Sequence, residues 1–505
     1  MSWLLSYIPF VPKPRPLPTV VPTDEVVPVQ LFDNTSTLRK VIMVWSFRFE
    51  EVLDPDKLND SLSQLLQMEG WRKLGGRFRR RLDGGVEIHI PSPFTDDRPP
   101  VYFTKEQFVT PMCDHPLASQ LPQATENIST SPGPRYFNPL HLGPGSARSW
   151  DDYIYGGDLP QLALHVLTFT DGTIVTLSHS HATADLIGFE TIIDAWSLVL
   201  NGRPESVPHF MPLHEDGMAG LLEPATEKHV LSGKELNGWR LAYWGLSTLY
   251  NSRRIGLESR LVCIPKRRMD RIMEECRAQI GSKIDPETKV MEPFISEGDV
   301  FVALVNKVTA QMQNPASTRN LMTMMALDPR NRAPSMFRPN TAVVQNSPTA
   351  IFFNCPSDQA LKLSVGELAS LSRQAILAQA TEEQMKAYSA MSAETVRSND
   401  MNVMFGDKDM SFQLISNWFK GKLLDKLDCT AAIVKEAPNR TQGRRGHPVY
   451  FHGTDPDSID DALLIPLIVI MNTDYDGNRW LSCVLPKKAW GGFLKTLESF
   501  ATAKS

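Results

Sequence analysis

The stretch LALHVLTFTDGTIVTLSHSHATADLIGFETIIDAWSLVL, residues 162–200, decides the fold class. Its first half holds two strand-like runs on either side of Asp171-Gly172, a dipeptide typical of tight hairpin turns. Its second half spaces apolar residues as one face of a helix does, and Asn201-Gly202 is a suitable stop. These apolar residues are Leu186, Phe189, Ile192, Ile193, Trp196 and Val199. The stretch therefore predicts a β-hairpin that leads directly into a helix.

Two histidines close the second predicted strand. Alternation with period two puts His179 and His181 on the same apolar face, with Ser180 on the other. His181 then ends the strand, and Asp185 lies in the turn or in the first turn of the helix. A strand end that leads into a helix is where an α/β sheet exposes reactive side chains, which favours a functional His181.

Two other interpretations of the histidine pair are open at this point. A zinc site needs at least three protein ligands, but neither histidine has a partner at i+4 and no Cys or Glu stands nearby. The sequence therefore predicts no metal site here. Two hydrogen-bonded core histidines would also fit the local string, so residues outside it must decide.

The composition is that of an ordinary globular protein. The chain has 505 residues, 42% of them hydrophobic and 22% charged, with a net charge of −5. Such a weakly acidic balance gives no field that attracts nucleic acid, so no nucleic-acid partner is expected. The length exceeds what one hydrophobic core usually covers, which favours two large domains.

Targeting and redox features are consistent with a cytoplasmic protein. No basic segment precedes the apolar run near the N-terminus, so we expect no signal peptide. The run ALLIPLIVIM, residues 462–471, is about half as long as a membrane span requires, and we expect a buried strand instead. Six scattered cysteines form no CxxC pair, which fits a reducing compartment.

Strand-like and helix-like segments alternate along the chain, which predicts an α/β protein with mixed sheets. Residues 113–150 are rich in Pro, Gly and Ser and predict a long surface loop, and residues 204–235 lack periodicity and form a candidate linker. We predict an N-terminal domain, 1–220, that carries the histidine pair and a C-terminal domain, 221–505, with a segment allowed to cross between them. The other expected elements are strands at 40–49 and 259–266, helices at 53–67 and 267–280, a helix capped by 296–299, two strands around Asp476-Gly477, and a helix from about 487.

Several stretches, in the same order along the chain, resemble motifs of the BAHD acyltransferases, especially the fungal members of secondary metabolism. His181-x-x-x-Asp185-x-x-Gly188 resembles the active-site motif HxxxD of that family. The other stretches are LGGRFRR (74–80), ISEGDVFVAL (295–304), LDPRNRAPSM (327–336) and VVQNSP (343–348). The resemblance covers most of the chain.

The resemblance implies two similar domains of the chloramphenicol acetyltransferase type with a channel between them. His181 would face the channel and, as a neutral imidazole, take a proton from the acceptor while the acceptor attacks an acyl-CoA thioester. Asp185 would turn away from the channel and pair with Arg330. Asn346 would stand where a strand of the family carries its Gly-Asn pair, in a supporting position.

The C-terminal motif DFGWG of the family is where this sequence departs. Ser416 and Trp418 resemble the Thr and Trp of the segment before that motif, so Ser416 could donate a hydrogen bond to a developing oxyanion. Asp428 matches the motif aspartate, but Cys-Thr-Ala-Ala follows it in place of Phe-Gly-Trp-Gly, so the sequence of this loop differs from the family motif. Cys429 fills a position normally held by Phe, and this favours packing over nucleophilic catalysis.

The sequence thus predicts a monomeric acyltransferase that uses acyl-CoA, such as acetyl-CoA, as co-substrate and holds no tightly bound cofactor. Its acceptor would be a hydroxyl of a small natural product of terpenoid or polyketide type. One alternative takes the acyl group from a polyketide carrier protein, and another is an inactive relative that only binds a ligand. Arg440, Arg444 and Arg445 could reach CoA phosphates, but a solvated loop is the favoured interpretation.

Overall fold

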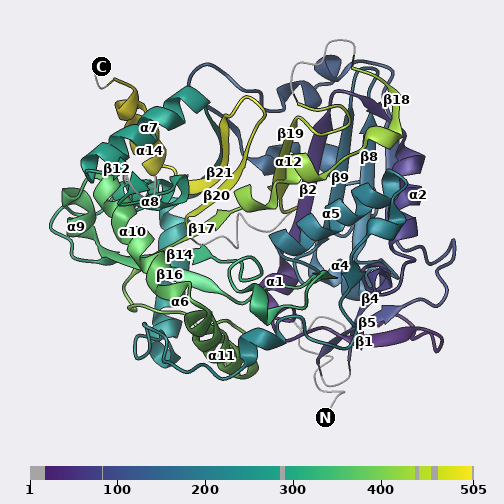
Figure 1. Ribbon diagram of the computed structural model, residues 1–505, viewed down its shortest axis with the longest axis horizontal. Helices are drawn as coiled ribbons and strands as arrows, with labels where there is room; N and C mark the ends of the chain where they lie inside the picture. Colours follow the sequence, from purple (N-terminus) through teal and green to yellow (C-terminus); the bar gives the residue numbers. More distant parts are fainter. Residues whose placement is uncertain (1–16, 82–83, 285–290, 438–442, 457–464, 503–505) are drawn as a thin grey trace, which may run out of the picture.

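The computed structural model describes residues 17–81, 84–284, 291–437, 443–456 and 465–502, and in this part of the chain two large β-sheets stand side by side (Figure 1). A five-stranded sheet has the order β19-β2-β9-β8-β6, and a seven-stranded sheet has the order β16-β14-β17-β20-β21-β11-β7. Figure 1 shows the five-stranded sheet on the right and the other on the left. The predicted α/β class with mixed sheets is confirmed.

The two sheets differ in where their strands lie along the chain. The five-stranded sheet contains β2 (Ile42–Phe49), β6 (Tyr102–Gln107), β8 (Leu162–Thr168), β9 (Thr173–Ser180) and β19 (Tyr450–Thr454). The seven-stranded sheet contains β7 (Ser129–Pro132), β11 (Leu257–Ile264), β14 (Asn320–Ala326), β16 (Ala350–Pro356), β17 (Ser411–Asn417), β20 (Leu467–Thr473) and β21 (Arg479–Pro486). β1 (Glu25–Pro28), β4 (Arg77–Arg80) and β5 (Val86–Ile90) form a third sheet, and the short pairs are β3 (Val52–Leu53) with β18 (Ile433–Lys435), β10 (His209–Phe210) with β15 (Thr341–Ala342), and β12 (Lys283–Ile284) with β13 (Met291–Glu292).

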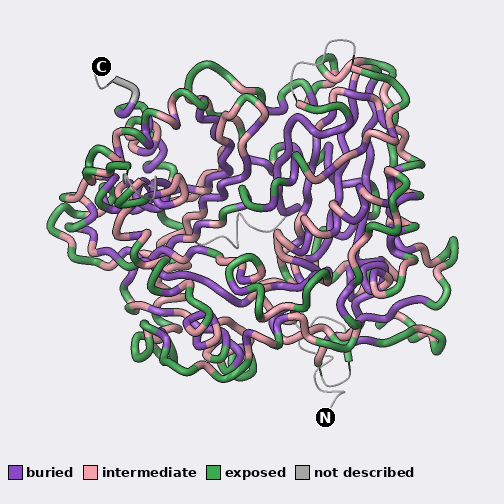
Figure 2. Tube along the Cα trace, viewed as in Figure 1, coloured by how far each residue is buried: buried purple, intermediate pink, exposed green. Residues whose placement is uncertain are grey.

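Helices pack against the large sheets and fill the outside of the molecule. They are α1 (Ser36–Lys40), α2 (Pro55–Leu65), α3 (Asn138–His141), α4 (Trp150–Tyr155), α5 (Leu186–Leu200), α6 (Gly238–Ile255), α7 (Lys266–Gln279), α8 (Glu297–Gln311), α9 (Ser357–Lys362), α10 (Val365–Gln379), α11 (Glu382–Asn399), α12 (Leu423–Lys426) and α14 (Ala489–Thr502). Figure 2 shows buried residues concentrated along both sheets and exposed residues on the outer helices and loops. None of the described helices is both long and apolar enough to cross a membrane.

Each large sheet takes an edge strand from the distant part of the chain. β19 pairs antiparallel with β2, although it lies close to the C-terminus, and β7 pairs antiparallel with β11. β7 and the short helix α3 fall inside residues 113–150, which the sequence predicts to be loop, so the prediction was wrong for Ser129–Pro132 and for Asn138–His141. The cause is that STSP is a short polar edge segment whose burial alternates only weakly, and such a strand leaves no periodic apolar signal.

The hairpin predicted from residues 162–200 is confirmed. β8 and β9 pair antiparallel with Val166 opposite Val175, and the Phe169 N–H donates to the Gly172 carbonyl at 2.9 Å. The two central turn residues are therefore Thr170 and Asp171, one position earlier than the Asp171-Gly172 pair suggests. Helix α5 follows as predicted and packs against α2.

The second sheet packs against α7, α8, α10 and α14, which form a separate apolar core with it. Ser296 caps α8 as predicted, because its hydroxyl accepts from the Asp299 N–H while the Asp299 carboxylate accepts from the Ser296 N–H. The segment 204–235 is mostly irregular, but it is tied down: the Met211 N–H donates to the Ala342 carbonyl at 3.1 Å and Leu221 is buried. The domain limits at 220 and 221 remain a prediction.

Candidate active site

His181 lies one residue beyond the end of β9. Its backbone N–H donates to the Val41 carbonyl at 2.8 Å, and its own carbonyl accepts from Asn346 Nδ2 at 2.8 Å. Every residue of β9 is buried, whereas His181 is half-buried. The backbone of His181 is thus held from both sides at the point where β9 ends, and the residue is less enclosed than those of the strand.

The surroundings of His181 favour a neutral imidazole. Burial lowers the pKa of His181 below its ordinary value, and the nearby Asp185 carboxylate only partly opposes this effect. The Nδ1 atom is buried and makes no hydrogen bond within the described part of the chain. A neutral ring at neutral pH has an unprotonated nitrogen that can accept a proton.

His179 has a different environment. Its Nε2 accepts from Trp45 Nε1 at 3.1 Å, and its Nδ1 is 2.8 Å from the Ser180 carbonyl, to which it donates when neutral. The ring stacks on Phe189 with centroids 5.4 Å apart and is fully buried. Burial lowers the pKa of His179 to about 4. Both nitrogens are used, so His179 is a hydrogen-bonded core residue.

Asp185 is occupied by structural contacts. It caps α5, with its Oδ1 accepting from the Gly188 N–H at 2.8 Å. Its Oδ2 accepts from Arg330 Nη1 at 3.1 Å and from the Ser347 N–H at 3.0 Å. The pairing of Asp185 with Arg330 that the family resemblance implies is present in the structure.

Arg330 has a second acidic partner that the motif does not reveal. Its Nη1 is 2.6 Å from Asp328 Oδ1, and its Nη2 donates to the Gln345 carbonyl at 2.6 Å. The carboxylates of Asp185 and Asp328 raise the pKa of Arg330, although burial opposes them as the largest single effect. Arg330 therefore joins the HxxxD turn to the segment 327–345 through charge-assisted hydrogen bonds.

Asp33 is a supporting residue that the sequence reasoning missed. Its Oδ1 accepts from the Asn346 N–H at 2.7 Å and from Asn346 Nδ2 at 2.8 Å. Because the same amide group also donates to the His181 carbonyl, Asp33 and Asn346 together hold the backbone of His181. Burial raises the pKa of Asp33 to about 6, and the Lys73 ammonium opposes that rise. Asp33 belongs to the polar run FDNTS, which reads as a surface turn and gives no sign of burial.

Ser416 and Trp418 come from the other large sheet. Ser416 lies in β17 and Trp418 follows this strand; Trp418 Nε1 donates to Ser416 Oγ at 2.9 Å. The hydroxyl proton of Ser416 is therefore free to be donated elsewhere. The Trp418 ring lies 4.6 Å from the Trp45 ring, which in turn bonds to His179. The two sheets thus meet through aromatic packing next to His179.

Asp428 and Cys429 both support the local fold. Asp428 Oδ1 accepts from the Thr430 N–H at 2.9 Å, and the Asp428 carbonyl accepts from Asn201 Nδ2 at 2.9 Å, which ties this turn to the end of α5. Cys429 is completely buried, and burial raises the pKa of its thiol. A thiol held in its neutral form is a poor nucleophile, so the packing role predicted for Cys429 fits its surroundings.

Arg444 and Arg445 carry less unbalanced positive charge than the sequence suggests. Arg444 pairs with Asp425 at 3.0 Å and Arg445 with Glu436 at 2.6 Å, with all four side chains exposed. Arg440 lies outside the described residues. These ion pairs agree with the interpretation of this segment as a solvated surface loop.

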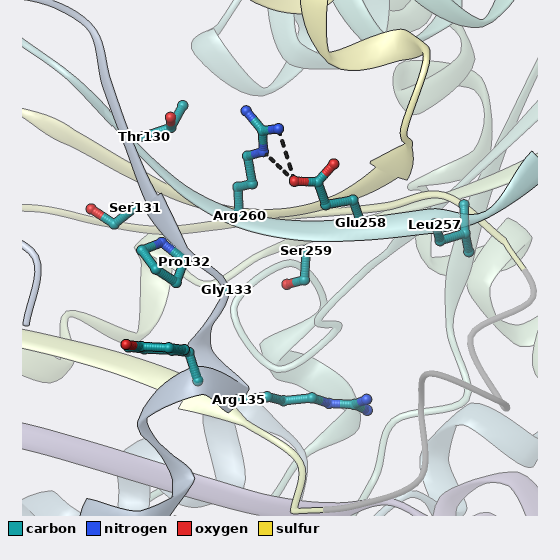
Figure 3. Close-up of a pocket in the computed structure, with 10 residues that line it drawn as sticks. Thr130, Ser131, Pro132, Gly133, Arg135, Leu257, Glu258, Ser259 and Arg260 are labelled. Atoms are coloured by element: carbon teal, nitrogen blue, oxygen red, sulfur yellow. Dashed lines mark hydrogen bonds and ion pairs between the residues drawn. The ribbon is translucent and has the colours of Figure 1, made fainter. Parts of the chain in front are cut away.

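A cavity of about 570 Å³ lies between β7 and the start of β11 (Figure 3). Its lining includes Ser131, Gly133, Arg135, Ser259 and Arg260, and Figure 3 shows Arg260 paired with Glu258 at its rim. The lining does not include His181 or Ser416, so the cavity is separate from these residues. Across the described ranges, no group of three or more His, Cys, Asp or Glu side chains could hold a metal ion.

Comparisons with known proteins give relatives over almost the whole chain. O-acetyltransferase PaAT-2 of Phomopsis amygdali is 31% identical over 486 residues, covering 94% of this chain and 97% of its own. Acetyltransferase pyiB of Pyricularia grisea is 32% identical over 488 residues and covers 93% of each chain. No family model matches the chain.

Solved structures share the fold at low sequence identity. TRI101 of F. graminearum, complexed with coenzyme A and T-2 mycotoxin, aligns with a TM-score of 0.62 at 14% identity, covering 94% of this chain and 98% of its own. Vinorine synthase aligns with a TM-score of 0.57 at 13% identity and covers 97% of each chain. These likenesses show the two-domain fold that the resemblance implied. The chain therefore belongs to the fungal branch of the BAHD-type acyltransferases and is an acyltransferase.

Proposed function

We propose that this acyltransferase moves an acyl group from acyl-CoA to a hydroxyl of a small natural product of terpenoid or polyketide type, with His181 as general base. Two relatives carry acetyltransferase names, and the structure of F. graminearum TRI101 contains coenzyme A and T-2 mycotoxin. Both facts support an acyl-CoA donor and a small organic acceptor for this chain.

The environment of His181 is the observation that carries the proposal. A base must be unprotonated and reachable from solvent at the working pH. His181 is half-buried, its pKa is lowered by burial, and its backbone is fixed by Val41 and Asn346. His179 is also unprotonated, with its pKa lowered to about 4, but it fails the second condition because it is fully buried and hydrogen-bonded at both nitrogens.

In the proposed step, the free imidazole nitrogen of His181 takes the acceptor hydroxyl proton while the oxygen attacks the thioester carbonyl. A C–O bond forms, and the carbonyl becomes an oxyanion. The hydroxyl proton of Ser416 is available to donate to that oxyanion, because Trp418 already donates to Ser416 Oγ. The C–S bond then breaks, and the His181 imidazolium returns its proton to the departing CoA thiolate.

Asp185 takes no part in proton transfer in this scheme. Both of its oxygens are engaged, one by the Gly188 N–H and the other by Arg330 and the Ser347 N–H. Its role is to fix the first turn of α5 and, with it, the direction in which His181 points. Asn346 and Asp33 fix the His181 backbone from the other side.

A direct assay tests the proposal. Purified protein is incubated with acyl-CoA of several chain lengths and a panel of terpenoid and polyketide alcohols, and release of free CoA thiol is followed. We expect thiol release that depends on both substrates and intersecting steady-state patterns, because direct transfer binds both substrates together. Transfer only from an acylated carrier protein would support the alternative donor, and binding without turnover would support the inactive relative; either result would refute the proposal.

A further inference from the structure

Helix α6 is attached to the molecule more loosely than any comparable element around it. It runs over 18 residues, Gly238–Ile255, and lies beside α11 and β16 (Figure 1). None of its residues is buried. Its inner side is anchored by Leu241 and Trp244, with the Trp244 ring 5.5 Å from Phe412. Helices in globular proteins gain most of their stability by burying an apolar face, and α6 buries little of its own.

The outer side of α6 carries large apolar residues in place of the usual polar face. Trp239, Tyr243, Leu246 and Tyr250 are 69%, 47%, 70% and 68% exposed, and we call these four the aromatic stripe. They stand at i, i+4, i+7 and i+11, which places them within an arc of about 60° on the helix. Single exposed apolar residues are common on protein surfaces, but a contiguous stripe marks a site of interaction.

Positive charge flanks the aromatic stripe, and α6 contains no acidic residue. Arg253 and Arg254 are exposed on either side of the stripe near the end of the helix, and neither forms an ion pair with any residue that the structure describes. Arg240 faces Asp407 at 3.7 Å and is partly balanced. Lys408 lies 4.9 Å above the Tyr243 ring and pairs with Asp409, so its charge is also balanced. Among the residues that the structure describes, the unbalanced cations beside the aromatic stripe are therefore Arg253 and Arg254.

We propose that α6 binds the surface of an anionic lipid bilayer, with the aromatic stripe inserted at the level of the headgroups. Trp and Tyr favour the membrane interface because their rings are apolar at one end and polar at the other. An apolar face flanked by arginines, on a helix without acidic residues, is the pattern of helices that lie in the interface plane. Anionic headgroups supply the charge that α6 lacks, whereas a second copy would bring an equally basic helix against it.

Flotation with lipid vesicles tests this inference on the full chain. We expect the protein to float with vesicles of phosphatidylcholine and phosphatidylserine, and to bind weakly to phosphatidylcholine alone. Added salt should weaken binding because it screens the attraction. Arg253→Glu with Arg254→Glu should reduce partitioning by about 25-fold or more, at about fivefold for each arginine lost. Trp239→Ser with Tyr250→Ser should reduce binding to both vesicle types.

Matched variants separate this surface from general effects of charge and hydrophobicity. Arg267→Glu with Arg271→Glu makes the same charge change on exposed positions of α7, and Val109→Ser removes an isolated apolar side chain that is 91% exposed. Both should float as the unchanged protein does. All variants should keep the circular dichroism spectrum and the acyltransferase rate with a water-soluble acceptor, since α6 carries none of the proposed reacting groups.

Three results would overturn the inference. The first is absence of flotation with phosphatidylserine vesicles, and the second is an equal loss of flotation in the α6 variants and their controls. The third is a dimer in lipid-free gel filtration that Trp239→Ser converts to monomer, which would make the aromatic stripe a contact between two copies.

Discussion

His179 and His181 stand two residues apart in the sequence, yet their rings lie in different environments. His179 lies within β9, with Trp45 on one nitrogen, the Ser180 carbonyl on the other and Phe189 stacked on its face. His181 follows the strand, and the hydrogen bonds on its two sides hold its backbone instead of its ring. Alternation along a strand thus predicts which face of the sheet a side chain lies on. The position of the strand end decides whether neighbouring side chains enclose that side chain and occupy its hydrogen-bonding atoms.

The position of the strand end explains the difference. β2 pairs with β9 from Ile42 opposite Ser180, and Val41, the residue before β2, receives the His181 N–H. Beyond Ser180, β2 no longer pairs with β9, and the chain leaves the sheet and enters α5 at its cap residue, Asp185. A residue at such a position keeps the precise placement of a sheet without being enclosed by it.

The largest expected effect distinguishes the two histidines by rate. His181→Ala should lower kcat/KM by about 10²–10⁴-fold with an unchanged circular dichroism spectrum, because it removes the base and little packing. His179→Ala should leave the rate of the folded protein nearly intact but lower its free energy of unfolding by about 3 kcal/mol, through a cavity and an unpaired Trp45 N–H. Equal losses of rate in both variants would show that the assignment of the base is wrong.

The second effect concerns Ser416, which we propose acts together with His181 from the other large sheet. Ser416→Ala should lower kcat by about 10²–10³-fold with little change in KM, because an oxyanion donor acts mainly in the transition state. Ser411→Ala, at the far end of the same strand β17, is the matched control and should keep its rate. If both serine variants behave alike, Ser416 supports Trp418 and does not stabilise the oxyanion.

The third expected effect is a pH dependence of stability that arises from the burial of His179. The folded protein lowers the pKa of His179 from 6.5 to about 4, so the unfolded chain binds the proton first as pH falls. The neutral His179 ring therefore contributes fully to the free energy of unfolding above pH 6.5. This contribution, about 3 kcal/mol, is lost as the pH falls from 6.5 toward about 4. Urea unfolding across this range should show a smaller loss for His179→Phe than for the unchanged protein.

Asp33 changes the free energy of unfolding in the opposite direction over part of the same pH range. Its pKa is raised to about 6 in the folded protein, so its contribution is present below about pH 4 and is lost as pH rises through 6. Because Asp33 is common to both proteins, its effect cancels in the difference between them. A difference that does not vary with pH would mean that the folded protein leaves the pKa of His179 at its ordinary value.

The smallest expected effect tests the support of the His181 turn. Asp185→Ala should lower the free energy of unfolding by about 2 kcal/mol, from a lost helix cap and lost charge-assisted hydrogen bonds. A larger loss is not expected, because Asp328 remains to balance Arg330 and Asp185 is 20% exposed. Asp185→Asn keeps the cap and is the matched control. A variant of normal stability but abolished turnover would point to a direct chemical role for Asp185.

The sequence by itself determined the elements near the site. Alternation and the turn residues in 162–200 predicted the hairpin and α5, and the segment 296–299 predicted the cap of α8, since these features depend on residues close together in the chain. The motif order also identified His181, Asp185, Arg330, Asn346, Ser416, Trp418 and Asp428. Their roles in catalysis remain predictions, although the structure brings Asp185 to Arg330 and Asn346 to His181.

Only the tertiary structure decided which groups complete the site and where the sheets end. Asp33 accepts a hydrogen bond from Asn346, and Asp328 binds Arg330 in addition to Asp185. β7 joins the seven-stranded sheet and β19 the five-stranded sheet, and the aromatic stripe of α6 is exposed. Each of these depends on contacts between segments far apart in sequence, where propensity and periodicity carry no information. A buried Asp in a polar run, a short polar edge strand and an uncovered apolar face look ordinary in the sequence, because burial is a property of what the rest of the chain brings to them.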